Sequence, residues 1–99
     1  MLVHSVYFWL KPELTAGQRQ AIRDGLEKLR GIRQVRQMFV GAPAATAERG
    51  VIDNTYDLAL TVLFDSVADQ DAYQVHPLHK DFLDKFAGMW KKVVVYDAE

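Results

Sequence analysis

The first strand-like segment of the chain, residues 3–10, is apolar on both of its faces. Val, Tyr, Phe and Trp dominate it, which is typical of a β-strand. One face carries His4, Val6, Phe8 and Leu10, and the other carries Val3, Ser5, Tyr7 and Trp9. A strand of this kind needs cover on both sides. The fold therefore has to supply one layer for each face of this strand.

The remaining patterns alternate between helix and strand. Thr15 and Gln18 have the spacing of a capping box and predict the start of the first helix. Further along the chain, Ser66 is a predicted N-cap and Pro77 a predicted first helical residue. The expected helices cover residues 15–30, 66–75 and 77–88, and the expected strands cover residues 3–10, 35–40, 56–64 and 90–96.

This order indicates two β-α-β halves joined by a long central segment. It predicts a single α+β domain over residues 1–99, with a ferredoxin-like split β-α-β fold and a four-stranded antiparallel sheet. Helices then cover only one face of the sheet. Candidates for the open face are Tyr7, Trp9, Met38, Val40 and Leu63. Two such sheets packed face to face would bury both open faces, so we predict a homodimer in the form of a dimeric α+β barrel.

Composition narrows the classes of partner and compartment. The formal net charge is −1 and there is no long basic run, which argues against nucleic acid as the main partner. Cysteine is absent, so disulfides and thiolate nucleophiles are excluded. The N-terminus lacks a secretion-signal pattern, and no apolar run reaches the length of a membrane span. We therefore expect a cytoplasmic protein with no membrane association.

The segment from Tyr73 to His79 concentrates the groups that can move protons. It contains two of the three histidines and one of the four tyrosines, and Pro77 interrupts it. His79 is expected in the first turn of the third helix, where a helix N-terminus lowers the pKa of an imidazole. Tyr73 could donate a hydrogen bond to a carbonyl or enolate oxygen. The alternative is that Tyr73 only packs against the sheet and His79 faces solvent.

The other two histidines carry weaker signals. His76 occupies the expected N-cap of the third helix, and its spacing from His79 could suit a metal. No third ligand is firmly placed beside them, so we expect neither a metal nor a cofactor. A lone histidine on an apolar strand face, such as His4, is more often a hydrogen-bonded core residue than a catalyst.

Three segments together with Trp90 resemble the stress-responsive A/B barrel domain family. They are HSVYFWLK at residues 4–11, FDSV at residues 64–67 and YQVHPLH at residues 73–79. The resemblance covers nearly the whole chain and implies a ferredoxin-like dimeric α+β barrel.

Functional residues follow from the same resemblance. The family's plant olivetolic acid cyclase closes a linear polyketide by a cofactor-free aldol condensation. Similarity to it implies that His79 is a general base, that Tyr73 is its hydrogen-bonding partner and that His4 lies on the floor of a pocket. The implied pocket lining is Val6, Phe8, Leu60, Phe82, Trp90 and His76. Leu58 stands where the cyclase has a further pocket histidine.

Three functional hypotheses remain open from the sequence. The first is a cofactor-free acid/base enzyme, cyclase-like or lyase-like, acting on a small carbonyl or polyketide-type compound. The second is a non-catalytic homodimer that binds a small hydrophobic ligand or a protein partner in a stress response, through the apolar sheet face and residues 41–54. A haem-degrading or cofactor-independent oxygenase is a third alternative, by analogy of fold alone.

Overall fold

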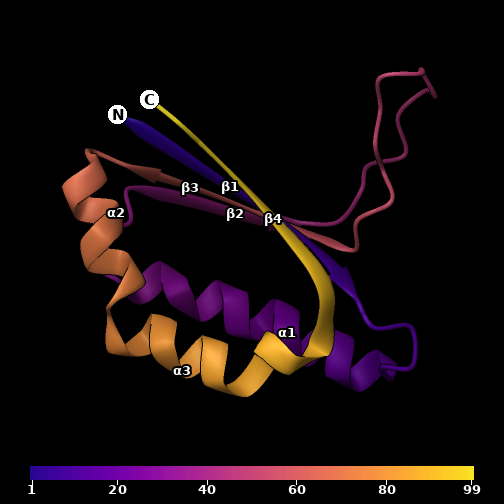
Figure 1. Ribbon diagram of the computed structural model, residues 1–99, viewed down its shortest axis with the longest axis horizontal. Coiled ribbons are helices and arrows are strands. Elements are labelled where there is room, and N and C mark those ends of the chain that lie inside the picture. Colours follow the sequence, from indigo (N-terminus) through magenta and orange to yellow (C-terminus); the bar gives the residue numbers. More distant parts are fainter.

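The computed structural model describes all 99 residues, from Met1 to Glu99. Its strands are β1 (Leu2–Leu10), β2 (Gln37–Gly41), β3 (Leu58–Phe64) and β4 (Trp90–Ala98). Its helices are α1 (Ala16–Lys28), α2 (Val67–Gln74) and α3 (Pro77–Phe86), with short 3-10 turns η1 (Leu29–Gly31) and η2 (Ala87–Met89) (Figure 1). The predicted α+β ferredoxin-like order of elements is confirmed. None of the helices combines the length and the apolar character that crossing a membrane requires.

Local side-chain chemistry starts each helix where the sequence indicates. The Thr15 hydroxyl accepts a hydrogen bond from the Gln18 amide at 3.1 Å, and the Gln18 side chain accepts one from the Thr15 amide at 2.8 Å. The Ser66 hydroxyl accepts from the Asp69 amide at 3.2 Å. These contacts satisfy amide groups that have no partner inside the first helical turn.

The sheet has the strand order β2-β3-β1-β4, and every neighbouring pair is antiparallel. All three helices lie on one side of it, and the other side carries no helix (Figure 1). β1 is an inner strand, with His4 opposite Val62 on β3 and opposite Asp97 on β4. This register brings residues from the two ends of the chain into contact.

The hydrophobic core fills the space between the sheet and the helices. β1 alternates strictly between buried and half-buried residues, and its buried set includes His4, Val6 and Phe8. The face of β1 that carries these residues is therefore the one that meets the helices.

Two residues expected on the open sheet face belong to the core instead. Met38 and Val40 are only 8% and 6% exposed, because they pair with Val62 and Leu60 on the helix-covered face. Phe39, between them, points the other way and is 66% exposed. The sequence does not show this because β2 is apolar at three successive positions.

The open face of the sheet carries an aromatic cluster, which we call the outer aromatic face: Tyr7, Trp9, Tyr56 and Tyr96. The ring centroid of Tyr7 lies 5.0 Å from that of Tyr56 and 6.2 Å from that of Tyr96, both in edge-on geometry. The segment 42–57 stands out from the body of the molecule, away from the helices (Figure 1). Its end returns to the sheet, where the Trp9 indole donates a hydrogen bond to the Thr55 hydroxyl at 3.0 Å.

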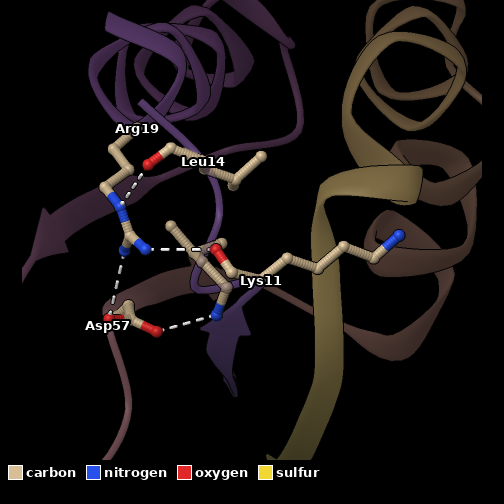
Figure 2. A network of polar contacts seen from close by, with 5 residues as sticks. Lys11, Leu14, Arg19 and Asp57 are labelled. Atoms are coloured by element: carbon tan, nitrogen blue, oxygen red, sulfur yellow. Dashed lines mark hydrogen bonds and ion pairs between the residues drawn. The ribbon is translucent and has the colours of Figure 1, made fainter. Parts of the chain in front are cut away.

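A polar network fastens the connection between β1 and α1 (Figure 2). The Asp57 carboxylate accepts a hydrogen bond from the Leu10 amide at 2.7 Å and pairs with Arg19 at 3.5 Å. Arg19 also donates to the carbonyl oxygens of Leu14 and Lys11, at 3.4 Å and 3.1 Å. The Lys11 amide in turn donates to the Met89 carbonyl at 3.0 Å, directly before Trp90. The network therefore holds the start of β4 against the end of β1.

Candidate functional site

A cavity of about 200 Å³ lies between the sheet and the helices. Eleven of its fourteen lining residues are hydrophobic. They come from all three helices, from η1 and from three of the four strands. The lining residues are His4, Val6, Phe8, Leu26, Leu29, Leu60, Tyr73, Gln74, His79, Phe82, Leu83, Trp90, Val93 and Val95.

The structure brings together most of the residues singled out in the sequence. His4, Tyr73 and His79 all line this cavity, as do the five apolar residues Val6, Phe8, Leu60, Phe82 and Trp90. His76 does not line it, contrary to expectation. Its Nδ1 accepts a hydrogen bond from the Leu78 amide at 3.1 Å, so the ring caps α3 instead. A short-range contact two residues away thus fixes the His76 side chain at the helix end.

Tyr73 and His79 meet at one end of the cavity, across the break between α2 and α3. Their ring centroids are 4.8 Å apart in edge-on geometry. Tyr73 is completely buried, and its ring also packs edge-on against Phe64 at 5.0 Å. The Tyr73 hydroxyl and His79 Nδ1 are both buried, and neither has a hydrogen-bond partner. Buried polar atoms without partners are rare in folded proteins, so a pair of them beside a cavity indicates a place for a polar ligand atom.

Burial keeps both of these groups neutral. Desolvation raises the pKa of the Tyr73 phenol well above its ordinary value of 10.0. Burial lowers the pKa of His79 below its ordinary value of 6.5, and positive charge on His4 lowers it further. His79 is also the third residue of α3, where the helix dipole disfavours an imidazolium. At neutral pH the site therefore offers a phenol O–H donor beside an uncharged imidazole.

His4 is held by partners that the sequence analysis did not find. Its Nδ1 lies 2.5 Å from an Asp97 carboxylate oxygen and 3.2 Å from the Gln70 side-chain amide. One nitrogen cannot donate to Asp97 and accept from Gln70 at once. The shorter contact to a charged group decides that Nδ1 carries the proton and donates it to Asp97. Nε2 makes no hydrogen bond within the chain and remains available to a ligand.

Several cavity residues were not identified from the sequence. Those on β4 can be recognised only when the register of the strand is known. Val93, Val95 and Asp97 alternate along β4, so all three share the face that meets the helices. Leu26 near the end of α1 and Leu29 in η1 are three residues apart, a helical spacing that does not distinguish a cavity wall from the rest of the core. No group of three or more His, Asp or Glu side chains has a geometry suited to metal binding.

The arrangement divides the cavity chemically. His4, Tyr73 and His79 form a polar end, and the ring centroids of His4 and Tyr73 are 6.0 Å apart. Phe8, Phe82 and Trp90 form an aromatic end, with the Trp90 ring centroid 5.1 Å from that of Phe8. Such a site can bind a compact apolar molecule and place one polar atom among three donor or acceptor groups.

Comparisons with known proteins agree with this fold. The family model described as "Stress responsive A/B Barrel Domain" matches residues 2–99. No curated protein matches the chain in sequence. A solved structure from Thermobifida fusca, described as a dimeric ferredoxin-like protein of unknown function, is 26% identical with a TM-score of 0.80, and the alignment covers 98% of this chain and 88% of that one.

Two plant proteins share the architecture at lower identity. A protein from Arabidopsis thaliana is 20% identical with a TM-score of 0.83, over 100% of this chain and 94% of that one. The hydroxynitrile lyase from Passiflora edulis is 23% identical with a TM-score of 0.82, over 98% of this chain and 90% of that one. At these identities the likeness extends to the fold alone.

Proposed function

The chain belongs to the stress responsive A/B barrel domain family, and from this premise we propose that it is a homodimeric, cofactor-free acid/base enzyme acting on a small carbonyl compound. The reaction would be lyase-like or cyclase-like. The observation that carries the proposal is the pair of buried, unpartnered polar atoms, Tyr73 Oη and His79 Nδ1, beside a cavity whose lining is mostly apolar.

The chemistry follows from the protonation states of these two groups. With its proton on Nε2, neutral His79 has a free lone pair on Nδ1 that can take a proton from the carbon next to a carbonyl group. The electrons of that C–H bond then form a C=C bond, and the carbonyl π electrons move to oxygen. Tyr73 donates a hydrogen bond to the resulting enolate oxygen, whose charge would otherwise be exposed to an apolar cavity.

His4 has a supporting place in this scheme. Its Nδ1 donates a hydrogen bond from β1 to Asp97 on β4, which fixes the orientation of the ring. Its Nε2 is then free to bind a ligand in the cavity that His4 lines. A fixed second imidazole at the same end orients a polar substrate atom toward Tyr73 and His79.

The outer aromatic face supports the homodimer. Tyr7, Trp9, Tyr56 and Tyr96 surround a hollow of about 380 Å³ on the helix-free side of the sheet, and Tyr96 is 64% exposed. Contiguous aromatic surface of this kind is typical of an interface. The Thermobifida fusca relative is described as dimeric. A second copy packed on this face would bury the aromatic side chains of both protomers.

A charge on this face should separate the protomers. We expect Tyr96→Glu to shift the protein from dimer to monomer in sedimentation velocity, because two buried carboxylates would face each other without partners. Val75→Glu is the matched control, since Val75 is equally exposed at 64% but lies at the end of α2. A wild-type protein that sediments as a monomer at high concentration would refute the dimer.

The acid/base proposal is testable without knowing the natural substrate. Acetophenone in D2O exchanges the protons of its methyl group through an enolate, and proton NMR follows the loss of signal. We expect the protein to accelerate this exchange and His79→Ala to lower the rate about a hundredfold or more, the usual contribution of a general base. His76→Ala is the control, because His76 caps α3 and does not line the cavity. Equal rates in the wild type and His79→Ala would refute the proposed role of His79.

A non-catalytic ligand-binding dimer is the second candidate. The apolar lining of the cavity favours it as much as it favours catalysis, and Leu58 stands where the resembled cyclase has a further histidine. Stabilisation of the folded protein by acetophenone without any proton exchange would support this candidate, since a ligand of the native state raises stability by mass action. The Passiflora edulis protein is a lyase on the same fold, but at 23% identity it does not transfer its activity to this chain.

A further inference from the structure

We propose that the cavity selects compact uncharged compounds, about the size of one six-membered ring with a carbonyl substituent, and excludes their carboxylate counterparts. This inference rests on the proposed function, because it names the kind of substrate that the same site accepts.

The lining of the cavity contains no residue that is permanently charged at neutral pH. None of its fourteen lining residues is Lys, Arg, Asp or Glu, and the only ionisable ones are His4, Tyr73 and His79. His4 is already paired with Asp97, whose carboxylate adds negative charge at this end. A bound carboxylate would therefore leave water without meeting a free cation. Burial of an unpaired charge is strongly unfavourable, whereas a carbonyl oxygen needs only a hydrogen-bond donor.

The two groups without hydrogen-bond partners, on Tyr73 and His79, are also uncharged. Burial lowers the pKa of His79, so at neutral pH its imidazole brings no positive charge to the cavity. Tyr73 stays protonated and supplies one O–H donor. The Tyr73 hydroxyl and the Gln74 side-chain amide are uncharged donors, which suit a carbonyl oxygen and do not neutralise a carboxylate.

The volume sets the size of the ligand. The cavity measures about 200 Å³. A buried apolar cavity of about 150 Å³ is known to bind benzene, and pockets for drug-sized ligands start at about 300 Å³. One ring with a short substituent therefore fits, and a long chain does not fit inside one protomer.

The two ends of the cavity set the orientation. His4 and Phe8 lie four residues apart on β1, which corresponds to about 13 Å along a strand. Trp90 packs beside Phe8 and stacks on Phe82 with 6.0 Å between ring centroids, so the aromatic end accepts the apolar ring. The carbonyl group then points to Tyr73. The partly exposed residues Leu83, Val93 and Val95 add apolar surface but no charge.

Acetophenone and benzoate are suitable probes because they have nearly the same shape and differ in charge. Isothermal titration of the full-length wild-type protein at pH 7 should show acetophenone binding at least about tenfold more tightly than benzoate, given the unfavourable transfer of an unpaired carboxylate. Equal affinities, a preference for benzoate, or no binding of either probe would overturn the inference.

A pair of lysine variants tests whether charge is the cause. Leu83→Lys places an ammonium group at the cavity and should strengthen benzoate binding about tenfold relative to acetophenone binding. Leu78→Lys is the matched control, because Leu78 lies on the same helix at nearly the same exposure, 40% against 39%, and lines no part of this cavity. Unchanged benzoate affinity in Leu83→Lys would show that charge does not exclude benzoate and would also overturn the inference.

These binding measurements separate the inference from the proposed enzyme. A protein that prefers acetophenone but does not exchange its methyl protons would retain the selectivity and refute the catalytic role. A protein that exchanges those protons while binding benzoate equally well would refute the selectivity alone.

Discussion

Removal of the Tyr73 hydroxyl should make the protein more stable and less active. Tyr73 is fully buried, and its Oη has no hydrogen-bond partner. A buried polar group in this condition destabilises the native state by about 1–3 kcal/mol relative to one that stays hydrated. Tyr73→Phe removes that penalty and keeps the aromatic ring that packs on Phe64, His4 and His79.

The net gain is expected to be smaller than the full penalty. The missing oxygen leaves a small void, whose effect subtracts a few tenths of a kcal/mol. We therefore expect the free energy of unfolding to rise by about 1 kcal/mol, which for a domain of this size raises Tm by about 4–8 °C. Ionisation of the phenol contributes nothing at pH 7, because burial raises the pKa of Tyr73.

Thermal and urea unfolding at one fixed protein concentration measure this change, since the Tm of a dimer depends on concentration. Val75→Thr is the control: this side chain is 64% exposed and lies outside both the cavity and the outer aromatic face, so the free energy of unfolding should change by less than about 0.5 kcal/mol. In the exchange assay, Tyr73→Phe should lower the rate about tenfold or more, because the enolate loses its donor. A variant destabilised by about 1 kcal/mol or more would mean that the Tyr73 hydroxyl is satisfied in the native state, and the argument for a ligand site would fail.

The remaining predictions concern pH and helix packing. Because the pKa of His79 is lowered from 6.5 in the fold, the unfolded chain binds its proton more readily. The free energy of unfolding should therefore fall as pH decreases from about 6.5 toward the folded pKa, a component that titrations of His79→Asn should lack. The exchange rate should rise with pH through that lowered pKa and then level off. A Cβ at Gly25 would lie 2.5 Å from the Phe86 ring, so Gly25→Ala should destabilise by about 1 kcal/mol despite its better helix propensity. Gly17→Ala on the same helix meets only Thr15 Oγ1 at 3.9 Å and should not destabilise in urea unfolding; equal effects at both sites would contradict the packing argument.

Local chemistry in the sequence determined the elements and their starts. Thr15 with Gln18, Ser66 and Pro77 begin helices through contacts that span at most a few residues, so their spacing was enough to predict them. The two-residue period of a β-strand likewise determined that His4, Val6 and Phe8 share a face. These features depend on neighbours along the chain, which the sequence displays directly.

Strand pairing decided what the sequence left open. Met38 and Val40 turned inward because β2 aligns them with Val62 and Leu60, and a run of apolar residues carries no mark of its own face. Pairing of β1 with β4 also places His4 beside Asp97, 93 positions away in the chain.

The two histidines around Pro77 separated for a similar reason. His76 accepts a hydrogen bond from the Leu78 amide at the start of α3. His79, one helical turn later, packs against Tyr73 and lines the cavity. The sequence determined which groups the site contains. Only the tertiary structure decided which of them are buried without a hydrogen-bond partner, because the environment of a buried polar atom is built from residues far apart in the chain.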